Sequence, residues 1–180
     1  MIRPFGSVSP TEEEVQAACR GDEIVPHPDV VMDRGFTVAA PPEAVWPWLV
    51  QLGKRRAGWY LPRSVERLVP TGRRALRRLD PRWQRLTVGD VIPDYGGPHE
   101  TFEVSAIEEP WALVYRSRRG RTNVSWAITL KPSDGRCTRV HLRLRLAPVR
   151  HRRAAEIGGG LFDLLTIAGM AAGLRERVDS

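Results

Sequence analysis

Apolar and polar residues alternate along the second half of the chain, and this pattern restricts the possible folds more than any other feature of the sequence. In residues 139–146, valine or leucine follows each of Arg139, His141, Arg143 and Arg145. Successive side chains of a strand point to opposite faces of a sheet. The segment therefore predicts an antiparallel strand with one face on a core and the other, arginine-bearing face in water.

The same reasoning predicts further strands. One precedes the alternating region and four lie within it, at residues 31–38, 87–92, 101–107, 112–117 and 122–131. Short turn-like segments separate the later strands, and each contains proline or glycine: 108–110, 118–120 and 133–135. Joins of this length are typical of hairpins, so we expect a run of neighbouring antiparallel strands.

Helix signals are found on both sides of this run. Thr11 followed by Glu14 has the spacing of a capping box and predicts a short helix over 12–19. Pro42 opens a second helix, in which Pro47 is expected to cause a kink or an end one turn early, with Gly53 as the stop. A third helical stretch is expected over 63–68.

The last expected helix is the longest and the most apolar. It covers 161–178 and could start near Arg152, with glycines at 158–160 as an interruption. Residues 157–174 contain a single charged residue, Asp163, which would cost about 2.5–3.5 kcal/mol at the centre of a membrane span. We therefore expect this helix to pack against protein and expect no transmembrane segment.

This order of elements predicts an α+β fold in which a curved antiparallel sheet is wrapped around a long C-terminal helix. Residues 30–180 would form one domain, and residues 1–29 an N-terminal arm laid over it. Large inward side chains on curved strands do not all reach the helix, so we expect a cavity between sheet and helix.

Composition excludes several classes of protein. Cys19 and Cys137 have no spacing typical of a zinc site or a disulfide framework, and the N-terminus lacks a signal sequence, so we expect a cytoplasmic protein without metal or cofactor. The net charge of +7 comes almost entirely from scattered arginines. Without a nucleic-acid motif, this charge indicates a solvated surface; binding to nucleic acid or an anionic membrane stays a lesser alternative.

One stretch carries a resemblance to a known family. The string APPEAVWPWLVQLGKRRAGWY at 40–60, with VGDVI at 88–92 and CTRV at 137–140, resembles the SRPBCC superfamily. This is the START and polyketide-cyclase group, which shares the helix-grip fold with the birch-pollen allergen. The resemblance implies a hydrophobic cavity for a lipid, polyketide or similar molecule, but no particular reaction. No CxH pair of a Rieske cluster is found.

The expected function is therefore binding of an apolar small molecule, with a cyclase or dehydratase that uses the same cavity as the alternative. The expected ligand-binding residues lie on inward stripes, near the cavity entrance or on the last helix: Trp59, Tyr60, Phe102, Tyr115, Trp126, Ile128, Leu142, Leu161 and Leu165. Weak catalytic candidates are His99, Tyr60 and Asp90, for which a loop position, core packing and a turn role are the simpler interpretations. Oligomeric state and ligand identity are left open.

Overall fold

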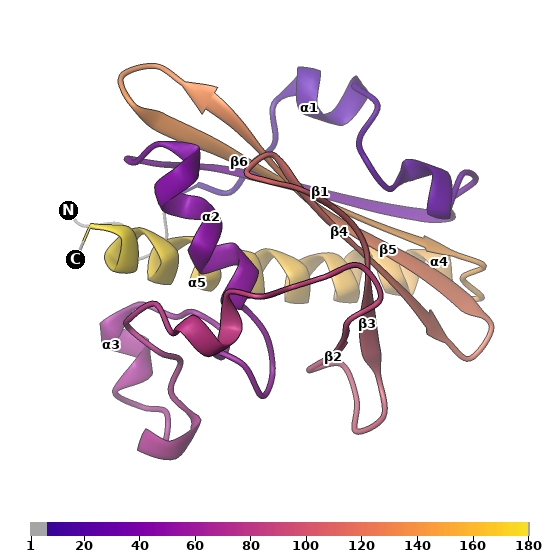
Figure 1. The fold of residues 1–180 in the computed structure, drawn as a ribbon. Helices are drawn as coiled ribbons and strands as arrows, with labels where there is room; N and C mark the ends of the chain where they lie inside the picture. Colours follow the sequence, from indigo (N-terminus) through magenta and orange to yellow (C-terminus); the bar gives the residue numbers. More distant parts are fainter. Residues whose placement is uncertain (1–6, 180) are drawn as a thin grey trace.

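A computed structural model describes residues 7–179 and shows one sheet with a long helix across one of its faces (Figure 1). The helices are α1 (Glu12–Gln16), α2 (Pro42–Gln51), α3 (Arg63–Glu66), α4 (Arg152–Ala154) and α5 (Gly160–Val178). The strands are β1 (Val30–Val38), β2 (Val91–Pro93), β3 (Thr101–Glu108), β4 (Ala112–Arg119), β5 (Thr122–Ser133) and β6 (Cys137–Ala147). Three single 3-10 turns complete the list: Asp22–Ile24, Thr71–Arg73 and Pro81–Trp83.

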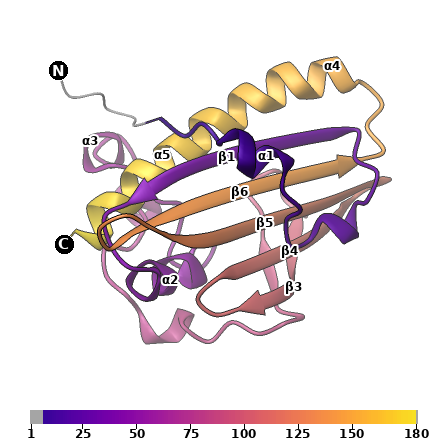
Figure 2. The same ribbon diagram turned by 90° about the horizontal axis from the view of Figure 1, so that it is seen from above.

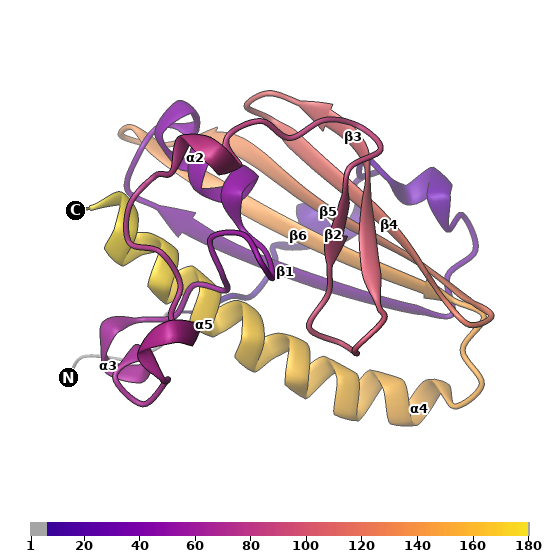
Figure 3. The same cartoon turned by 60° about the horizontal axis from the view of Figure 1, so that its bottom comes forward.

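The six strands form a single antiparallel sheet in the order β1-β6-β5-β4-β3-β2. β1, the first strand in the chain, forms the edge of the sheet opposite β2. It pairs with β6 along its whole length, from Val30 opposite Leu146 to Val38 opposite Thr138. α2 and α5 lie on one face, which we call the inner face (Figure 3). The predicted α+β fold, a curved sheet with a C-terminal helix across it, is confirmed.

Strand boundaries follow the alternation except at β2. The prediction began this strand at residue 87, but only Val91–Pro93 pairs with β3. The earlier residues form a turn, in which the Thr87 amide donates a hydrogen bond to the Asp90 carboxylate at 2.8 Å and Gly89 has a φ of +94°. Alternation in so short a segment does not distinguish a strand from a turn that leads into one.

Pro47 does not end α2, which continues for another turn to Gln51. The amide that proline lacks would have bonded the carbonyl of residue 43, in the first turn of the helix, where Glu43 is exposed to water. The expected early end is therefore wrong. The flanking Trp46 and Trp48 are 4% and 7% exposed and fix the helix in the core, as predicted.

The last helix is interrupted close to the glycines at 158–160, as predicted. A π-helical turn over Ala155–Gly159 separates α4 from α5. The C-terminal half of α5 packs in the core, with Met170, Ala171 and Leu174 fully buried. By length and composition the helix 152–178 could cross a membrane, but the core helix of a globular domain passes the same test.

α5 approaches the loop before α3 very closely. A Cβ added at Gly173 would lie 2.5 Å from the Leu61 amide nitrogen, so only glycine fits there. Four residues later, the buried Arg177 donates hydrogen bonds to Glu66 at 2.5 Å and to the Leu61 carbonyl at 3.1 Å. Backbone contact and an ion pair together hold the helix against the inner side of the domain.

The other face of the sheet, here the outer face, is covered by residues 7–29, which we call the N-terminal arm (Figure 2). The capping box of α1 is confirmed, with Thr11 and Glu14 each bonding the backbone of the other. The helix itself is shorter than expected and ends at Gln16. Residues 1–6 of the predicted arm lie outside the described residues.

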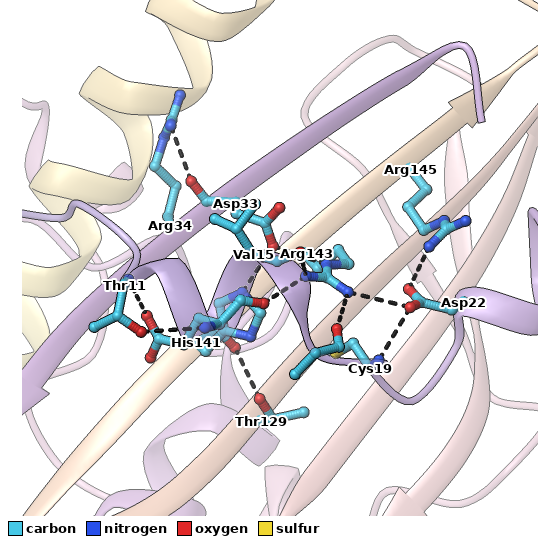
Figure 4. A network of polar contacts seen from close by, with 12 residues as sticks. Thr11, Val15, Cys19, Asp22, Asp33, Arg34, Thr129, His141, Arg143 and Arg145 are labelled. Atoms are coloured by element: carbon cyan, nitrogen blue, oxygen red, sulfur yellow. Dashed lines mark hydrogen bonds and ion pairs between the residues drawn. The ribbon is translucent and has the colours of Figure 1, made fainter.

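The arginine-bearing face of β6 is therefore not in water, and this expectation was wrong. His141 and Arg143 are 7% and 4% exposed beneath the arm. Arg143 donates to the carbonyls of Glu14, Val15 and Ala17 at 2.6, 3.0 and 2.8 Å (Figure 4). The alternation of the strand is unchanged, but the polar stripe binds main chain in place of solvent.

Candidate functional site

Five aromatic rings contact one another at the inner face, and we call them the aromatic wall. Phe102, Tyr115 and Trp126 come from the adjacent strands β3, β4 and β5. Trp59 comes from the loop after α2, and Tyr95 from the loop between β2 and β3. Pairing of Val104 with Tyr115, and of Tyr115 with Trp126, brings the three strand residues together.

Trp126 lies at the centre of the wall. Its ring centroid is 5.4 Å from Tyr115, 5.7 Å from Phe102 and 6.2 Å from Trp59. Tyr95 meets Trp59 edge to face at 6.2 Å. Rings at these separations attract one another beyond the burial of their area, so the wall is a rigid apolar surface.

The wall is only partly buried. Trp59, Phe102 and Trp126 are half-buried and pack on the core, whereas Ile128 and Leu142 lie deeper and are 0% and 2% exposed. Of the predicted ligand-binding residues, Trp59, Phe102, Tyr115 and Trp126 are therefore brought together. Ile128 and Leu142 support the inner face from within the core.

The last helix adjoins the wall through Trp59, whose indole Nε1 donates to the Thr166 carbonyl at 3.2 Å. The predicted Leu161 and Leu165 lie in the preceding turns of α5 and are 57% and 62% exposed. An ion pair that sequence reasoning missed joins Asp163 to Arg34 of β1 at 2.8 Å. Burial raises the pKa of the Asp163 carboxyl, and the charge of Arg34 offsets part of this effect.

Charged groups border the wall at the loop between β2 and β3. Asp94 pairs with Arg119, whose guanidinium lies 5.1 Å from the centre of the Phe102 ring. Lys54 donates to the Asp94 carbonyl at 2.8 Å and lies 5.8 Å from the Tyr95 ring. These cations cover ring faces at one edge of an otherwise apolar surface.

The Ser117 hydroxyl on the inner face of β4 is buried and has no hydrogen-bond partner among the described residues. The Tyr115 hydroxyl lies on the same face and forms no hydrogen bond within residues 7–179. Tyr115 is 3% exposed. Burial raises the pKa of its phenol well above the ordinary value, and the positive charge of Arg56 opposes only part of this rise. At neutral pH the phenol is therefore protonated and has a hydrogen bond to offer.

The weak catalytic candidates do not meet at the wall. Tyr60 is fully buried, and its hydroxyl donates to the Trp48 carbonyl at 2.7 Å. Asp90 accepts the turn hydrogen bond from Thr87. His99 is exposed in the loop 94–100 and makes no polar contact within the described residues. None of these placements tests a catalytic role.

The outer face carries a network of polar contacts and two pockets. Asp33 accepts hydrogen bonds from Arg143 at 2.8 Å and contacts His141 at 2.7 Å. A pocket of about 240 Å³ lies under the arm beside Cys19 and Trp111, and another of about 440 Å³ beside Arg116. The predicted cavity between sheet and helix is not supported by these two pockets and stays a prediction.

No cluster of three metal-ligating side chains is found within residues 7–179. Cys19, within the arm, is half-buried, and burial raises the pKa of its thiol to about 11. The charged groups of the outer face are paired with one another or with main chain. We therefore interpret that network as the attachment of the arm.

Residues 29–180 match the family described as polyketide cyclase / dehydrase and lipid transport. The chain belongs to this family. The resemblance to the polyketide-cyclase group is thereby confirmed, and the family extends from the start of β1 to the end of the chain.

Solved structures with the same fold come from several bacteria. A protein from Rhodobacter sphaeroides is 15% identical, with a TM-score of 0.53 over 86% of this chain and 95% of the other. A Staphylococcus saprophyticus protein is 13% identical, with 0.51 over 83% and 92%. The XoxI protein from Bacillus cereus is 15% identical, with 0.50 over 81% and 96%. At such identities the likeness concerns the fold alone.

No curated protein matches the chain. The family assignment thus gives a range of functions, from polyketide cyclisation and dehydration to lipid transport, and the residues of the inner face must be used to choose among them. Sequence reasoning identified four of the five rings of the wall as ligand-binding residues. Tyr95 was not among the predicted residues, because nothing in a loop sequence indicates which ring the loop will approach.

Proposed function

We propose that the chain binds an apolar small molecule, a lipid or a polyketide-like compound, on the aromatic wall between the sheet and the N-terminal half of α5. The observation that carries this proposal is the half-buried state of Trp59, Phe102 and Trp126 in mutual contact. Ligand sites are lined mainly by apolar and aromatic side chains, and the exposed part of these rings offers such a lining. The family description is consistent with this class of ligand.

The polar groups near the wall favour a ligand with one or two carbonyl or hydroxyl groups. The buried Ser117 hydroxyl has no hydrogen-bond partner among the described residues, and the Tyr115 hydroxyl on the same face forms no hydrogen bond there. A few well-placed hydrogen bonds in an apolar site set orientation and specificity. We therefore expect oxygenated apolar compounds to bind more tightly than plain hydrocarbons of the same size.

The test is calorimetric titration with palmitate and with a hydroxylated anthraquinone. We expect saturable binding to at least one probe and a loss of affinity of roughly tenfold or more in Trp126→Ala. The matched control is Trp111→Ala, because Trp111 is 43% exposed and lines the pocket under the arm. Binding of neither probe, or equal affinity in the two variants, would contradict the proposal.

A second candidate function, proton transfer in a cyclase or dehydratase, is favoured by one observation. The Tyr115 phenol is protonated, buried and without a partner, which suits it to donate a hydrogen bond or a proton to a substrate carbonyl. The catalytic candidates chosen from sequence have either a structural hydrogen bond or an exposed loop position.

Turnover of a poly-β-ketone substrate by variants would test this role. Tyr115→Phe should slow cyclisation by roughly 10²-fold or more, whereas the loss of one hydrogen bond to a ligand carbonyl should weaken binding by only about tenfold. Tyr60→Phe is the matched control, since its hydroxyl is bonded to Trp48, and it should lose stability but not turnover. Loss of turnover in Tyr60→Phe or His99→Ala, with Tyr115→Phe active, would restore the sequence-based candidates.

A further inference from the structure

The π-helical turn before α5 and the N-terminal half of α5 carry large apolar side chains that remain exposed. Ile157, Leu161, Phe162, Leu164 and Leu165 are 75%, 57%, 70%, 40% and 62% exposed. We call these five residues the apolar ridge. Scattered exposed leucines are ordinary on a protein surface, but five large apolar side chains exposed within nine consecutive residues are a concentration typical of an interaction site.

Arginines lie at the same end of the molecule as the ridge. β6 leads directly into α4, and the hairpin between β4 and β5 lies beside this connection, where Thr122 donates to the Pro148 carbonyl at 2.8 Å (Figure 3). Four exposed arginines come from these two segments and form no ion pair within residues 7–179: Arg118, Arg121, Arg150 and Arg153. We call them the basic end.

We propose that the apolar ridge and the basic end together bind the surface of an anionic lipid bilayer. The helix would lie in the interface, with Phe162 and Ile157 among the acyl chains and the arginines at the level of the phosphates. An apolar helix surface flanked by cations is the pattern of interfacial helices. Each arginine held near an anionic surface adds about 1 kcal/mol of attraction.

The charges favour lipid over a second copy of the chain. Residues 150–165, which include the ridge, contain two acidic residues, and one of them, Asp163, is already paired with Arg34. A second copy would therefore offer few carboxylates to the basic end. An anionic bilayer matches both surfaces, because its phosphates can pair with the basic end and its acyl chains can cover the apolar ridge. The helix does not need to cross the bilayer, since Met170 and Leu174 stay buried in the domain.

Cosedimentation with vesicles of phosphatidylcholine and phosphatidylglycerol in equal parts, against vesicles of phosphatidylcholine alone, tests the proposal. We expect binding to the mixed vesicles that weakens as salt rises, and little binding to the neutral ones. Ile157→Ser/Phe162→Ser should lower the partition coefficient roughly tenfold or more. Arg150→Gln/Arg153→Gln should lower it by a similar factor, on the mixed vesicles only.

Leu68→Ser is the matched control, because Leu68 is 86% exposed and lies after α3, away from the ridge. No binding to the mixed vesicles at low salt overturns the proposal. So does a concentration-dependent dimer in sedimentation velocity that the Phe162 variant abolishes, since this result would assign the ridge to a second copy. Ligand titration without vesicles should not change in the Ile157/Phe162 variant, so failure of one proposal is distinguishable from failure of the other.

Discussion

At the residue scale, Arg143 shows how one side chain can hold a distant segment in place. Its guanidinium bonds three carbonyls of the arm and also the carboxylates of Asp33 and Asp22, at 2.8 and 3.1 Å. A buried charge is tolerated only when nearly all of its donors have partners. Arg143 meets this condition because the arm turns its main-chain oxygens toward the sheet.

Asp33 gives a pH-dependent prediction at this scale. Burial alone would raise the pKa of its carboxyl, but hydrogen bonds from His141 and Arg143 outweigh burial and lower it. A lowered folded-state pKa contributes stability above the unfolded value of about 3.9, and this contribution is lost as pH falls through the folded value. Asp33→Asn should therefore lower the free energy of unfolding at pH 7 by about 1.5–3 kcal/mol.

Urea denaturation of wild type and Asp33→Asn at pH 7 and again near pH 3 would measure this effect. The difference between the two proteins should shrink in acid, where the wild-type carboxyl takes up its proton. Asp134→Asn is the control, because Asp134 is exposed in the turn before β6. If the difference in the free energy of unfolding did not depend on pH, packing and not the charge of Asp33 would hold the arm.

At the element scale, the position of α5 depends on the close approach of Gly173 to Leu61. Gly173→Ala should force the helix and the loop apart and cost about 1–3 kcal/mol. Gly158→Ala is the matched control, because nothing lies within 4 Å of the Cβ it would add. Thermal unfolding of both variants measures the contrast, and equal midpoints would mean that the loop moves freely.

The elements also show which parts of a fold can be predicted from sequence. Alternation identified β3 to β6 almost to the residue, because each has a buried face along its whole length. It failed at β2, where a turn has a similar pattern, and it placed the outer stripe of β6 in water. The arm that covers this stripe binds through its backbone, and backbone acceptors leave no signature in a sequence.

The residues of the candidate site also fall into those that sequence predicts and those that it does not. Inward stripes identified Phe102, Tyr115 and Trp126, since alternation fixes the face of a strand residue. Tyr60 and His99 lie in loops, where sequence does not fix direction, and the structure places one in the core and the other in solvent. The pair Arg34 and Asp163 joins residues far apart in sequence, and only the helix position brings them together.

At the scale of the whole molecule, the sheet is covered on both faces by different means. The inner face packs on α2 and α5 through apolar side chains, and the outer face holds the arm mainly through arginines (Figure 2). The proposed ligand site thus lies on the inner face, whereas the arm stabilises the sheet from the outer face. The family match starts at residue 29, so the arm lies outside it.

Removal of residues 1–29 tests this division between the two faces. The truncated chain should lose at least about 2–3 kcal/mol of stability, because it lacks the apolar burial that Val8 and Val25 provide. Both side chains are 3% exposed in the full chain. Affinity for a ligand of the aromatic wall should not change. Urea denaturation and calorimetric titration measure the two quantities, and loss of affinity in a folded truncated chain would show that the two faces are coupled.

The arginines of β6 bond to the arm largely at its carbonyl oxygens, including those of Ser9, Glu14, Ala17 and Val25. Every amino acid supplies the same oxygen in that position. Substitutions at the exposed positions of this segment should therefore be tolerated as long as its path is kept, whereas a single proline or a deletion that alters the path would release it. Selection acting here would preserve length, curvature and the few buried or paired side chains, and leave the exposed residues free to drift.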